Sequence, residues 1–293
     1  MKPAPFEYIR PSSIEEACAL LAADEGARVI AGGQTLVPLM AMRLARPTRL
    51  VDIARIRSLS YVREEAGAIE IGATTRQCVL EVDPLMRAKL PLLAAVMPYI
   101  GHSATRARGT IGGSLANADP AAELVLTAVT LGATLIYREQ ADTQEIPASE
   151  FFVGPMVTML PPTACLLAVR FPVWRESRVG VAFHEINARR SDFAFASAAA
   201  QVALDGDGRC QRLALGIGAV APVPLRLDAK ALGCEGRPFE EGRIREAIAA
   251  TLAGIEPFAD LHASAEYRRR AGLTLAMRAL NDAVQAAQAK HAR

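Results

Sequence analysis

Two short segments of the chain each combine a pair of adjacent glycines with hydroxyl residues. The first is Ala31-Gly32-Gly33-Gln34-Thr35, and the second is Thr110-Ile111-Gly112-Gly113-Ser114. Glycine lets backbone approach a ligand closely and adopt positive φ, and free N–H groups at a helix N-terminus favour an anion such as phosphate. Two such loops are suited to gripping the two phosphates of one dinucleotide, although either alone also fits a plain turn.

Alternating strand and helix patterns surround these loops and are expected to position them. Ser13 to Glu16 is a capping box that predicts a helix through Leu21. Strands are expected at 28–31, 51–53, 69–73 and 166–171, because these runs are apolar or alternate with period two. Helical segments are expected from Leu36 to Met40, at 76–81 and at 90–100, the last ending at Gly101.

Asn117 and Asp119 follow the second loop within a helical turn, and their side chains allow a structural and a ligand-binding interpretation. Asp119-Pro120 resembles an N-cap and first residue of a helix that runs to Leu131. The same side chains are also placed to contact a ligand that the preceding loop would hold. Both roles are compatible, so both residues are candidates for the site.

The sequence pattern changes beyond 172–181, where we expect a domain boundary. Two antiparallel strands are predicted at 193–204 and 209–217, around a loop rich in turn formers. The chain is expected to be mostly helical from Ile244 onward. Apolar residues recur there at spacings of three and four and form one stripe. The stripe consists of Leu273, Met277, Leu280, Val284 and Ala287.

Three further motifs have plain structural interpretations. Gly216-Ile217-Gly218 begins a Rossmann-like fingerprint, but Pro222 and Pro224 would block the helix that this motif requires, so a closely packed strand end is favoured. The three consecutive arginines 268–270 are expected to form a solvated face or a subunit contact. The charged run 183–194 is expected to be a solvated loop or one that faces a ligand or partner.

Composition narrows the class of protein. The 293 residues are 51% hydrophobic and carry a net charge of only +2, which argues against a dedicated nucleic-acid or anionic-membrane surface. No secretory signal or membrane span is recognisable, so a cytoplasmic protein is expected. The five cysteines have no CxxC spacing, and neither a metal ligand set nor a catalytic constellation stands out; we therefore predict no metal site and no catalytic residue.

Taken in order along the chain, these motifs resemble one known family. The resemblance rests on the first loop with Leu36, on Ile100-Gly101-His102, on the stretch 106–114 and on Asn117-Ala118-Asp119-Pro120-Ala121-Ala122-Glu123. Together they resemble the FAD-binding medium (flavoprotein) subunit of the molybdenum hydroxylases, of the carbon monoxide dehydrogenase and xanthine dehydrogenase type. The likeness extends from Phe6-Glu7-Tyr8 to Glu266-Tyr267, with Gln34 and Thr35 where many relatives have His and Ser.

The resemblance implies an α+β fold in two parts. Residues 1–175 would form an FAD-binding domain of the vanillyl-alcohol-oxidase/PCMH-like kind, with two α/β subdomains at about 1–55 and 56–175. Residues 178–289 would form a C-terminal flavoprotein domain, built from a three-stranded antiparallel sheet and a helical bundle.

The resemblance also implies non-covalent FAD and its binding residues. Both glycine motifs would hold the pyrophosphate, Asn117 and Asp119 would lie near the ribityl or phosphate region, and Asp192 would approach the flavin from the C-terminal domain. The implied binding residues are Ala31, Gly32, Gly33, Gln34, Thr35, Leu36, Gly101, Thr110, Ile111, Gly112, Gly113, Ser114, Asn117, Asp119 and Asp192.

The implied function is electron transfer within a hetero-oligomer. A large subunit with a molybdenum cofactor would oxidise the substrate, a small subunit with [2Fe-2S] clusters would relay electrons to FAD, and an external acceptor would take them. The assembly would be a dimer of heterotrimers. Two alternatives remain: a self-contained FAD oxidase of the vanillyl-alcohol type, and a nucleotide-binding scaffold without electron transfer.

Overall fold

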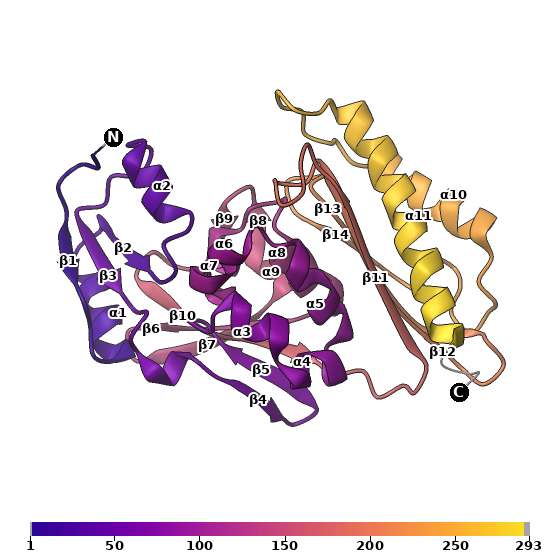
Figure 1. Cartoon of the computed structure of the whole chain (residues 1–293), viewed down its shortest axis with the longest axis horizontal. Helices are drawn as coiled ribbons and strands as arrows, with labels where there is room; N and C mark the ends of the chain where they lie inside the picture. Colours follow the sequence, from indigo (N-terminus) through magenta and orange to yellow (C-terminus); the bar gives the residue numbers. More distant parts are fainter. Residues whose placement is uncertain (1, 290–293) are drawn as a thin grey trace. The chain divides into compact units, whose positions relative to one another are not determined.

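The computed structural model describes residues 2–289, which divide into two compact units. Unit 1 contains the residues up to Asp83 together with His102–Ala118 and Ala133–Pro172. Unit 2 contains Pro84–Gly101, Asp119–Gly132 and the residues from Val173 onward. The α-helices and β-strands of both units are labelled in Figure 1. Within the described residues, no helix is both long and apolar enough to cross a membrane.

Unit 1 begins with a small parallel sheet in the strand order β1-β3-β2. Its strands are β1 (Glu7–Ile9), β2 (Ala27–Ile30) and β3 (Arg49–Asp52), and they are joined by helices α1 (Ile14–Ala22) and α2 (Leu36–Ala41). The strand predicted at 28–31 and the helix predicted after the first glycine loop are both confirmed. Parallel order matters here because the carboxyl ends of all three strands lie at one edge.

The capping box predicted for α1 is confirmed in its first half. The Ser13 hydroxyl accepts from the backbone N–H of Glu16, at 3.2 Å. The Glu16 carboxylate, however, accepts from the backbone N–H and hydroxyl of Ser12 rather than from Ser13. The helix then packs Ala17 and Leu21 into a cluster with Val51 of β3.

The larger sheet of unit 1 is antiparallel, in the order β4-β5-β10-β6-β7. Its strands are β4 (Val62–Glu65), β5 (Ala68–Gly72), β6 (Thr134–Glu139), β7 (Asp142–Pro147) and β10 (Ala164–Pro172). The remaining elements of the unit are η1 (Arg57–Leu59), α3 (Gln77–Val82), α6 (Ser103–Arg108), α7 (Ile111–Asn117), α9 (Ala148–Phe151), β8 (Phe152–Gly154) and β9 (Val157–Thr158). The strands predicted at 69–73 and 166–171 are confirmed as β5 and β10.

Unit 2 is built on an antiparallel sheet of four consecutive strands. These are β11 (Val179–Ile186), β12 (Ala196–Leu204), β13 (Cys210–Gly218) and β14 (Leu225–Asp228). The three-stranded sheet implied by the resemblance is therefore corrected to four, because Leu225 to Asp228 pair with the end of β13. The helices are α4 (Pro84–Lys89), α5 (Pro91–Val96), η2 (Met97–Tyr99), α8 (Glu123–Leu131), α10 (Glu241–Ala253) and α11 (Ala265–Ala289).

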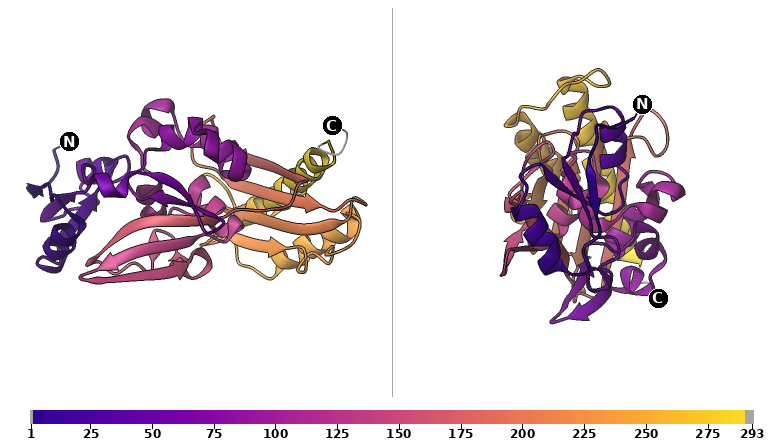
Figure 2. Two further views of the ribbon diagram at one scale, coloured as in Figure 1. Left: turned by 90° about the horizontal axis from the view of Figure 1, so that it is seen from below. Right: turned by 90° about the vertical axis from the view of Figure 1, so that its left-hand side faces the viewer.

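Helices cover both faces of this sheet. Alternate residues of β13 face opposite ways: a Cβ at Gly216 would lie 1.8 Å from Thr130 of α8, whereas Ile217 packs near Gly272 of α11. Figure 2 shows α11, in yellow, running along the sheet. Gly216 therefore serves close packing within a strand, as predicted, and the Rossmann alternative is excluded.

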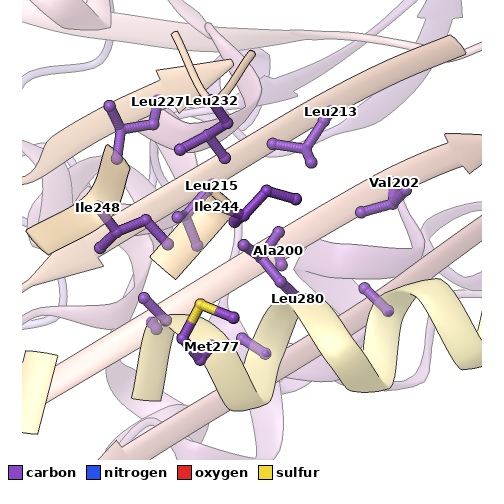
Figure 3. Packing of buried hydrophobic residues seen from close by; sticks show 14 of the residues in the cluster. Ala200, Val202, Leu213, Leu215, Leu227, Leu232, Ile244, Ile248, Met277 and Leu280 are labelled. Carbon is purple, nitrogen blue, oxygen red and sulfur yellow. The ribbon is translucent and has the colours of Figure 1, made fainter. Parts of the chain in front are cut away.

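The apolar stripe of α11 is used inside unit 2. Met277 and Leu280 are buried against Ala200 and Val202 of β12, and Ile248 of α10 closes the same cluster (Figure 3). Burying such side chains contributes about 1.5 to 3 kcal/mol each. The stripe is thus a core element and not a free surface.

Arg268 corrects the prediction of a solvated arginine face. Its side chain is only 2% exposed and donates hydrogen bonds to the backbone oxygens of Phe195 and Ala219, at 2.7 and 2.9 Å. It also donates to Asp260, at 2.7 Å, and lies over the ring of Phe258. A buried guanidinium is tolerated because most of its donors are paired. Arg268 therefore ties the start of α11 to the strand ends.

Candidate functional site

The three parallel strands of unit 1 end beside a cavity of about 450 Å³. The first glycine loop follows β2, Arg10 follows β1, and Asp52 is the last residue of β3. Ligands of open parallel sheets bind at this carboxyl edge, where loops diverge from the strands. The cavity is lined by Tyr8, Arg10, Ile30, Ala31, Gly32, Gly33, Gln34, Val37, Pro38, Asp52, Ala54, Arg76 and Arg108.

The first glycine loop offers backbone donors to this cavity. Gly33 adopts φ +71°, a conformation that favours glycine, and α2 begins three residues later at Leu36. Within residues 2–289, no acceptor pairs with the backbone N–H groups of Gly32, Gly33, Gln34 or Thr35. Gly32 and Gly33 are partly exposed, Gln34 is exposed, and all three line the cavity, so their N–H groups are available to an anionic ligand.

Charged side chains make the same cavity electropositive. Arg10, Arg76 and Arg108 line it together with a single carboxylate, that of Asp52. The Tyr8 hydroxyl donates to Asp52, and Arg10 donates to the Tyr8 oxygen at 2.8 Å and to Asp52 at 3.4 Å. The two remaining guanidinium groups have no carboxylate partner in the cavity, so they leave positive charge for a phosphate.

The second glycine loop uses its backbone N–H groups inside the protein. Thr110 is the N-cap of α7, and its hydroxyl accepts from Gly113 N–H at 3.1 Å. Ile111 and Gly112 donate to the carbonyl oxygens of Thr75 and Ala73, at 3.1 and 2.9 Å, and Ser114 donates to Thr110 O. The donors that this loop leaves for a ligand are therefore its hydroxyls, of which that of Ser114 belongs to a partly exposed residue and that of Thr110 to a buried one.

Glycine at 112 is required by packing. A Cβ there would lie 2.5 Å from Ala73 Cβ and 2.6 Å from Ala73 O, closer than real contacts permit. Gly112 thus lets the start of α7 approach the end of β5. This close approach fixes where the second loop stands in unit 1.

The first loop meets the segment that leads into the second. A Cβ at Gly32 would lie 2.5 Å from Arg108 O and 3.0 Å from Gly109 Cα. Arg76 donates to the same Arg108 carbonyl. The structure therefore brings the predicted residues 31–36 beside the chain that enters the 110–114 motif, within one unit.

The remaining predicted site residues are divided between the units. Asn117 is the last residue of α7 in unit 1, followed by Ala118 with φ +51°. Gly101, Asp119 and Asp192 belong to unit 2. Asp192 accepts from Arg189 at 3.1 Å, and Gly101 adopts φ +47°.

Asp119 is not the N-cap of the helix predicted after it. Its carboxylate accepts from the N–H of Ala121, and its carbonyl accepts from Ala122, which makes a turn. Helix α8 therefore begins at Glu123, with Ala122 as N-cap. The Pro120 carbonyl, instead of starting a helical ladder, accepts from Ala219 N–H.

A group of carboxylates with raised pKa values lies in unit 2 near this turn. Burial raises the pKa of Glu123 to about 7, and the charge of Asp119 adds to the effect. Burial also raises the pKa of Glu185 to about 8, with a further contribution from Glu123. No cation pairs with Glu123 or Glu185 among the described residues, so both carboxylates hold protons close to neutral pH.

Sequence reasoning missed Tyr8, Arg10, Asp52, Arg76 and Arg108, which complete the cavity. A usable signal existed for the first three, because the residues at the carboxyl ends of parallel strands share one edge of the sheet. Arg76 and Arg108 had no such signal. They reach the cavity because an isolated backbone pairing joins Arg76 to Thr110 and because Gly32 packs on Arg108.

Comparison with known families shows two matches along the chain. Residues 4–174 match the FAD binding domain in molybdopterin dehydrogenase. Residues 181–283 match the CO dehydrogenase flavoprotein C-terminal domain.

Individual relatives match over nearly the full chain. The 6-hydroxypseudooxynicotine dehydrogenase complex subunit alpha of Paenarthrobacter nicotinovorans is 35% identical, over 98% of this chain and 97% of its own length. A solved chain of carbon monoxide dehydrogenase from Hydrogenophaga pseudoflava is similar with a TM-score of 0.92 and 32% identity, covering 98% of this chain and 99% of that one. A chain of quinoline 2-oxidoreductase from Pseudomonas putida 86 gives a TM-score of 0.91 at 33% identity, with the same coverage.

Proposed function

Since the chain belongs to the family of FAD-binding subunits of molybdopterin dehydrogenases, we propose that it serves as the FAD-carrying electron-transfer subunit of a molybdenum-containing hydroxylase. The observation that carries the proposal in this chain is the cavity at the first glycine loop. Unpaired backbone N–H groups and uncompensated arginines meet there, at the carboxyl edge of a parallel sheet.

The residues of unit 1 fit the phosphates of FAD. The N–H groups of Gly32 to Thr35 and the guanidinium groups of Arg76 and Arg108 would hold the pyrophosphate, with the hydroxyls of Thr110 and Ser114 as further donors. The positive φ of Gly33 exposes the backbone, and the missing Cβ of Gly32 keeps the loop on the Arg108 segment. Bound FAD supplies the redox chemistry, and the chain supplies binding, orientation and electrostatics.

The proposal extends to residues of both predicted domains. Residues 1–175 would form the FAD-binding domain, and residues 178–289 would form the C-terminal flavoprotein domain. Asn117, Asp119 and Gly101 would contact the cofactor near the ribityl or phosphate region, and Asp192 would approach the flavin. The protonated carboxyl of Glu123 would give this region a hydrogen-bond donor at neutral pH, a role that an ionised carboxylate lacks.

The electron path proposed for the complex has three parts. A large subunit with a molybdenum cofactor oxidises the substrate, a small subunit with [2Fe-2S] clusters passes electrons to this chain, and an external acceptor receives them. A dimer of heterotrimers is the proposed assembly. Support comes from relatives whose own names mark them as one subunit of a dehydrogenase complex or as a medium chain.

Anaerobic reduction of the flavin tests this proposal. The flavin of the isolated chain should not be bleached by organic substrates, whereas addition of the large and small partner chains should allow a substrate of the complex to bleach it. Fast bleaching of the isolated chain by an alcohol or amine would favour the self-contained FAD oxidase instead. Failure of the purified chain to bind FAD at micromolar concentration would favour the scaffold alternative.

A further inference from the structure

Two cysteines of unit 2 lie side by side, and neither is among the residues assigned to FAD. Cys210 is the first residue of β13, and Cys234 lies in the turn that follows β14. Their sulfurs are 3.7 Å apart, and the two side chains are 1% and 3% exposed. Both are free thiols, separated by 24 positions in the sequence.

Backbone hydrogen bonds hold the two cysteines opposite each other. Cys210 N–H donates to Arg237 O at 2.8 Å, and Gly236 N–H donates to Cys210 O at 2.9 Å. Cys234 N–H donates to Ala229 O at 2.9 Å, and its own carbonyl accepts from Arg237. Because the backbone on both sides of the pair is fixed, the close approach of the sulfurs is a built feature of the turn.

The turn around Cys234 gives a reagent a route to the pair. Gly233, Glu235 and Gly236 are exposed, and both glycines have positive φ, at +64° and +65°. A Cβ at Gly236 would meet nothing within 4 Å, so space surrounds the turn on the solvent side. Small opening motions of such a turn would expose the Cys234 sulfur while β13 stays in the sheet.

We propose that Cys210 and Cys234 form a reversible disulfide bond, which makes this turn a redox-sensitive modification site of unit 2. The sulfurs need to close from 3.7 Å to a bond length near 2 Å, a small change for side chains already in contact. The oxidant is a low-molecular-weight disulfide. The bond joins the start of β13 to the turn that leads into α10.

The reaction is a pair of thiol–disulfide exchanges. The Cys234 thiolate attacks one sulfur of the reagent disulfide, forms a mixed disulfide and releases one reagent thiolate. The Cys210 sulfur then attacks the Cys234 sulfur, loses its proton to water, and releases the second reagent thiolate. Two protein thiols are oxidised and one reagent disulfide is reduced to two thiols, so electrons and protons balance.

The hydrogen bond between the two sulfurs assigns the order of attack. It lowers the pKa of Cys234 and raises the pKa of Cys210, where burial adds to the rise. The thiolate is the nucleophile in such exchanges. Cys234, in the exposed turn, is therefore the attacking residue, and Cys210, at the strand start, is the resolving one.

Mass mapping of the full FAD-loaded chain tests the proposal with oxidised glutathione as the probe. A Cys78→Ser background removes a partly exposed thiol that would react independently. We expect a product two hydrogens lighter, with the Cys210 and Cys234 peptides cross-linked and fully separated again by dithiothreitol. The thermal midpoint of the cross-linked chain should rise by several degrees, because the bond restricts the unfolded chain.

Variants of the two cysteines distinguish their roles. Cys210→Ser should trap one glutathione on Cys234, whereas Cys234→Ser should leave Cys210 unmodified; Cys210→Ala repeats the first test if the serine variant does not fold. The proposal is overturned if both thiols of the folded chain remain alkylatable after long exposure to the probe. A disulfide that joins other cysteines, or that forms only after unfolding, would overturn it equally.

Discussion

The two glycine loops both combine adjacent glycines with hydroxyl residues, but among the described residues one leaves its backbone N–H groups unpaired and the other pairs them all. The first loop follows a parallel strand, and its N–H groups from Gly32 to Thr35 have no partner among the described residues. The second loop caps α7, and its N–H groups from Ile111 to Ser114 all bond to protein oxygens. A glycine pair in the sequence therefore indicates that another group comes close to the backbone. It does not tell whether that group is a ligand or another part of the protein.

The two loops therefore have different roles. Gly33 exposes backbone donors to a cavity, whereas Gly112 lets α7 pack on Ala73. The first loop would contact phosphate through its main chain. The second would contribute hydroxyls from a position that its packing glycine determines.

The buried carboxylates show a similar contrast, between a group that has cationic partners and groups that have none among the described residues. Burial opposes ionisation of Glu70, but hydrogen bonds from Tyr61 and Arg170, with the charge of Arg63, outweigh it and lower its pKa. Glu123 and Glu185 have no such cations, and their pKa values rise. Glu70 is thus a structural ion-pair centre, while the unit 2 carboxylates are free to exchange protons near neutral pH.

The largest effect is expected from Gly112→Val. The new side chain would overlap Ala73 and its carbonyl, so unit 1 should lose about 3 kcal/mol of folding stability, at the upper end for overpacking. Denaturant unfolding of the FAD-free chain measures this loss. Gly242→Ala is the matched control, since a Cβ there meets nothing within 4 Å. Equal stabilities for the two variants would mean that Gly112 has no packing role.

The next effect is the pH dependence caused by Glu123. Its pKa in the folded chain is about 7, above the ordinary value of 4.5. Between these two pH values, the folded chain therefore holds a proton that the unfolded chain has lost. Its contribution to stability is full below pH 4.5 and is lost as the pH rises through 7. Glu123→Gln should therefore be more stable than wild type at pH 8 by about 2 to 3 kcal/mol.

Unfolding free energies between pH 4 and pH 9 measure this prediction. The glutamine variant should show a shallower fall between pH 5 and pH 8, and Glu246→Gln on α10, where the residue is exposed, serves as control. Wild-type and variant curves that stay parallel over this range would contradict a protonated Glu123.

A smaller effect is expected from Arg108→Ala. Removing this exposed guanidinium should weaken FAD affinity about tenfold at low salt and less at high salt, because screening reduces the charge contribution. Titration of FAD at two ionic strengths measures both values. Arg108→Lys should retain most of the affinity, and Arg245→Ala, on α10, should have no effect. An unchanged affinity in Arg108→Ala would remove this residue from the phosphate site.

Much of the fold was predictable because local patterns agree with it. Alternation at 69–73, the cap at Ser13 and the stripe through Met277 and Leu280 each determine an element that the structure confirms. The prediction of Asp119 as a helix N-cap was wrong because its carboxylate accepts from a nearby N–H in a turn, which imitates a helix cap in sequence. Arg268 was mispredicted because its partners, Phe195, Ala219 and Asp260, come from separate loops.

The candidate site was predictable in its loops but not in its lining. Motif order identified residues 31–36 and 110–114, whereas Arg76 and Arg108 depend on contacts between segments distant in sequence. The sequence also does not reveal whether the N–H groups of a loop are hydrogen-bonded within the protein. This depends on the carbonyl oxygens of Ala73 and Thr75, which the β5 end supplies to the second loop alone.

Titration of the wild-type chain and of Gly33→Val with FAD tests the central claim most directly. The added side chain, at φ +71°, would displace the loop whose open N–H groups face the cavity. We predict one FAD bound per wild-type chain, and affinity at least about 100-fold weaker in the variant at matched folded fraction, as expected when two charge-assisted hydrogen bonds are lost. Wild-type affinity in the folded variant, or a wild-type chain that takes FMN alone, would contradict the account.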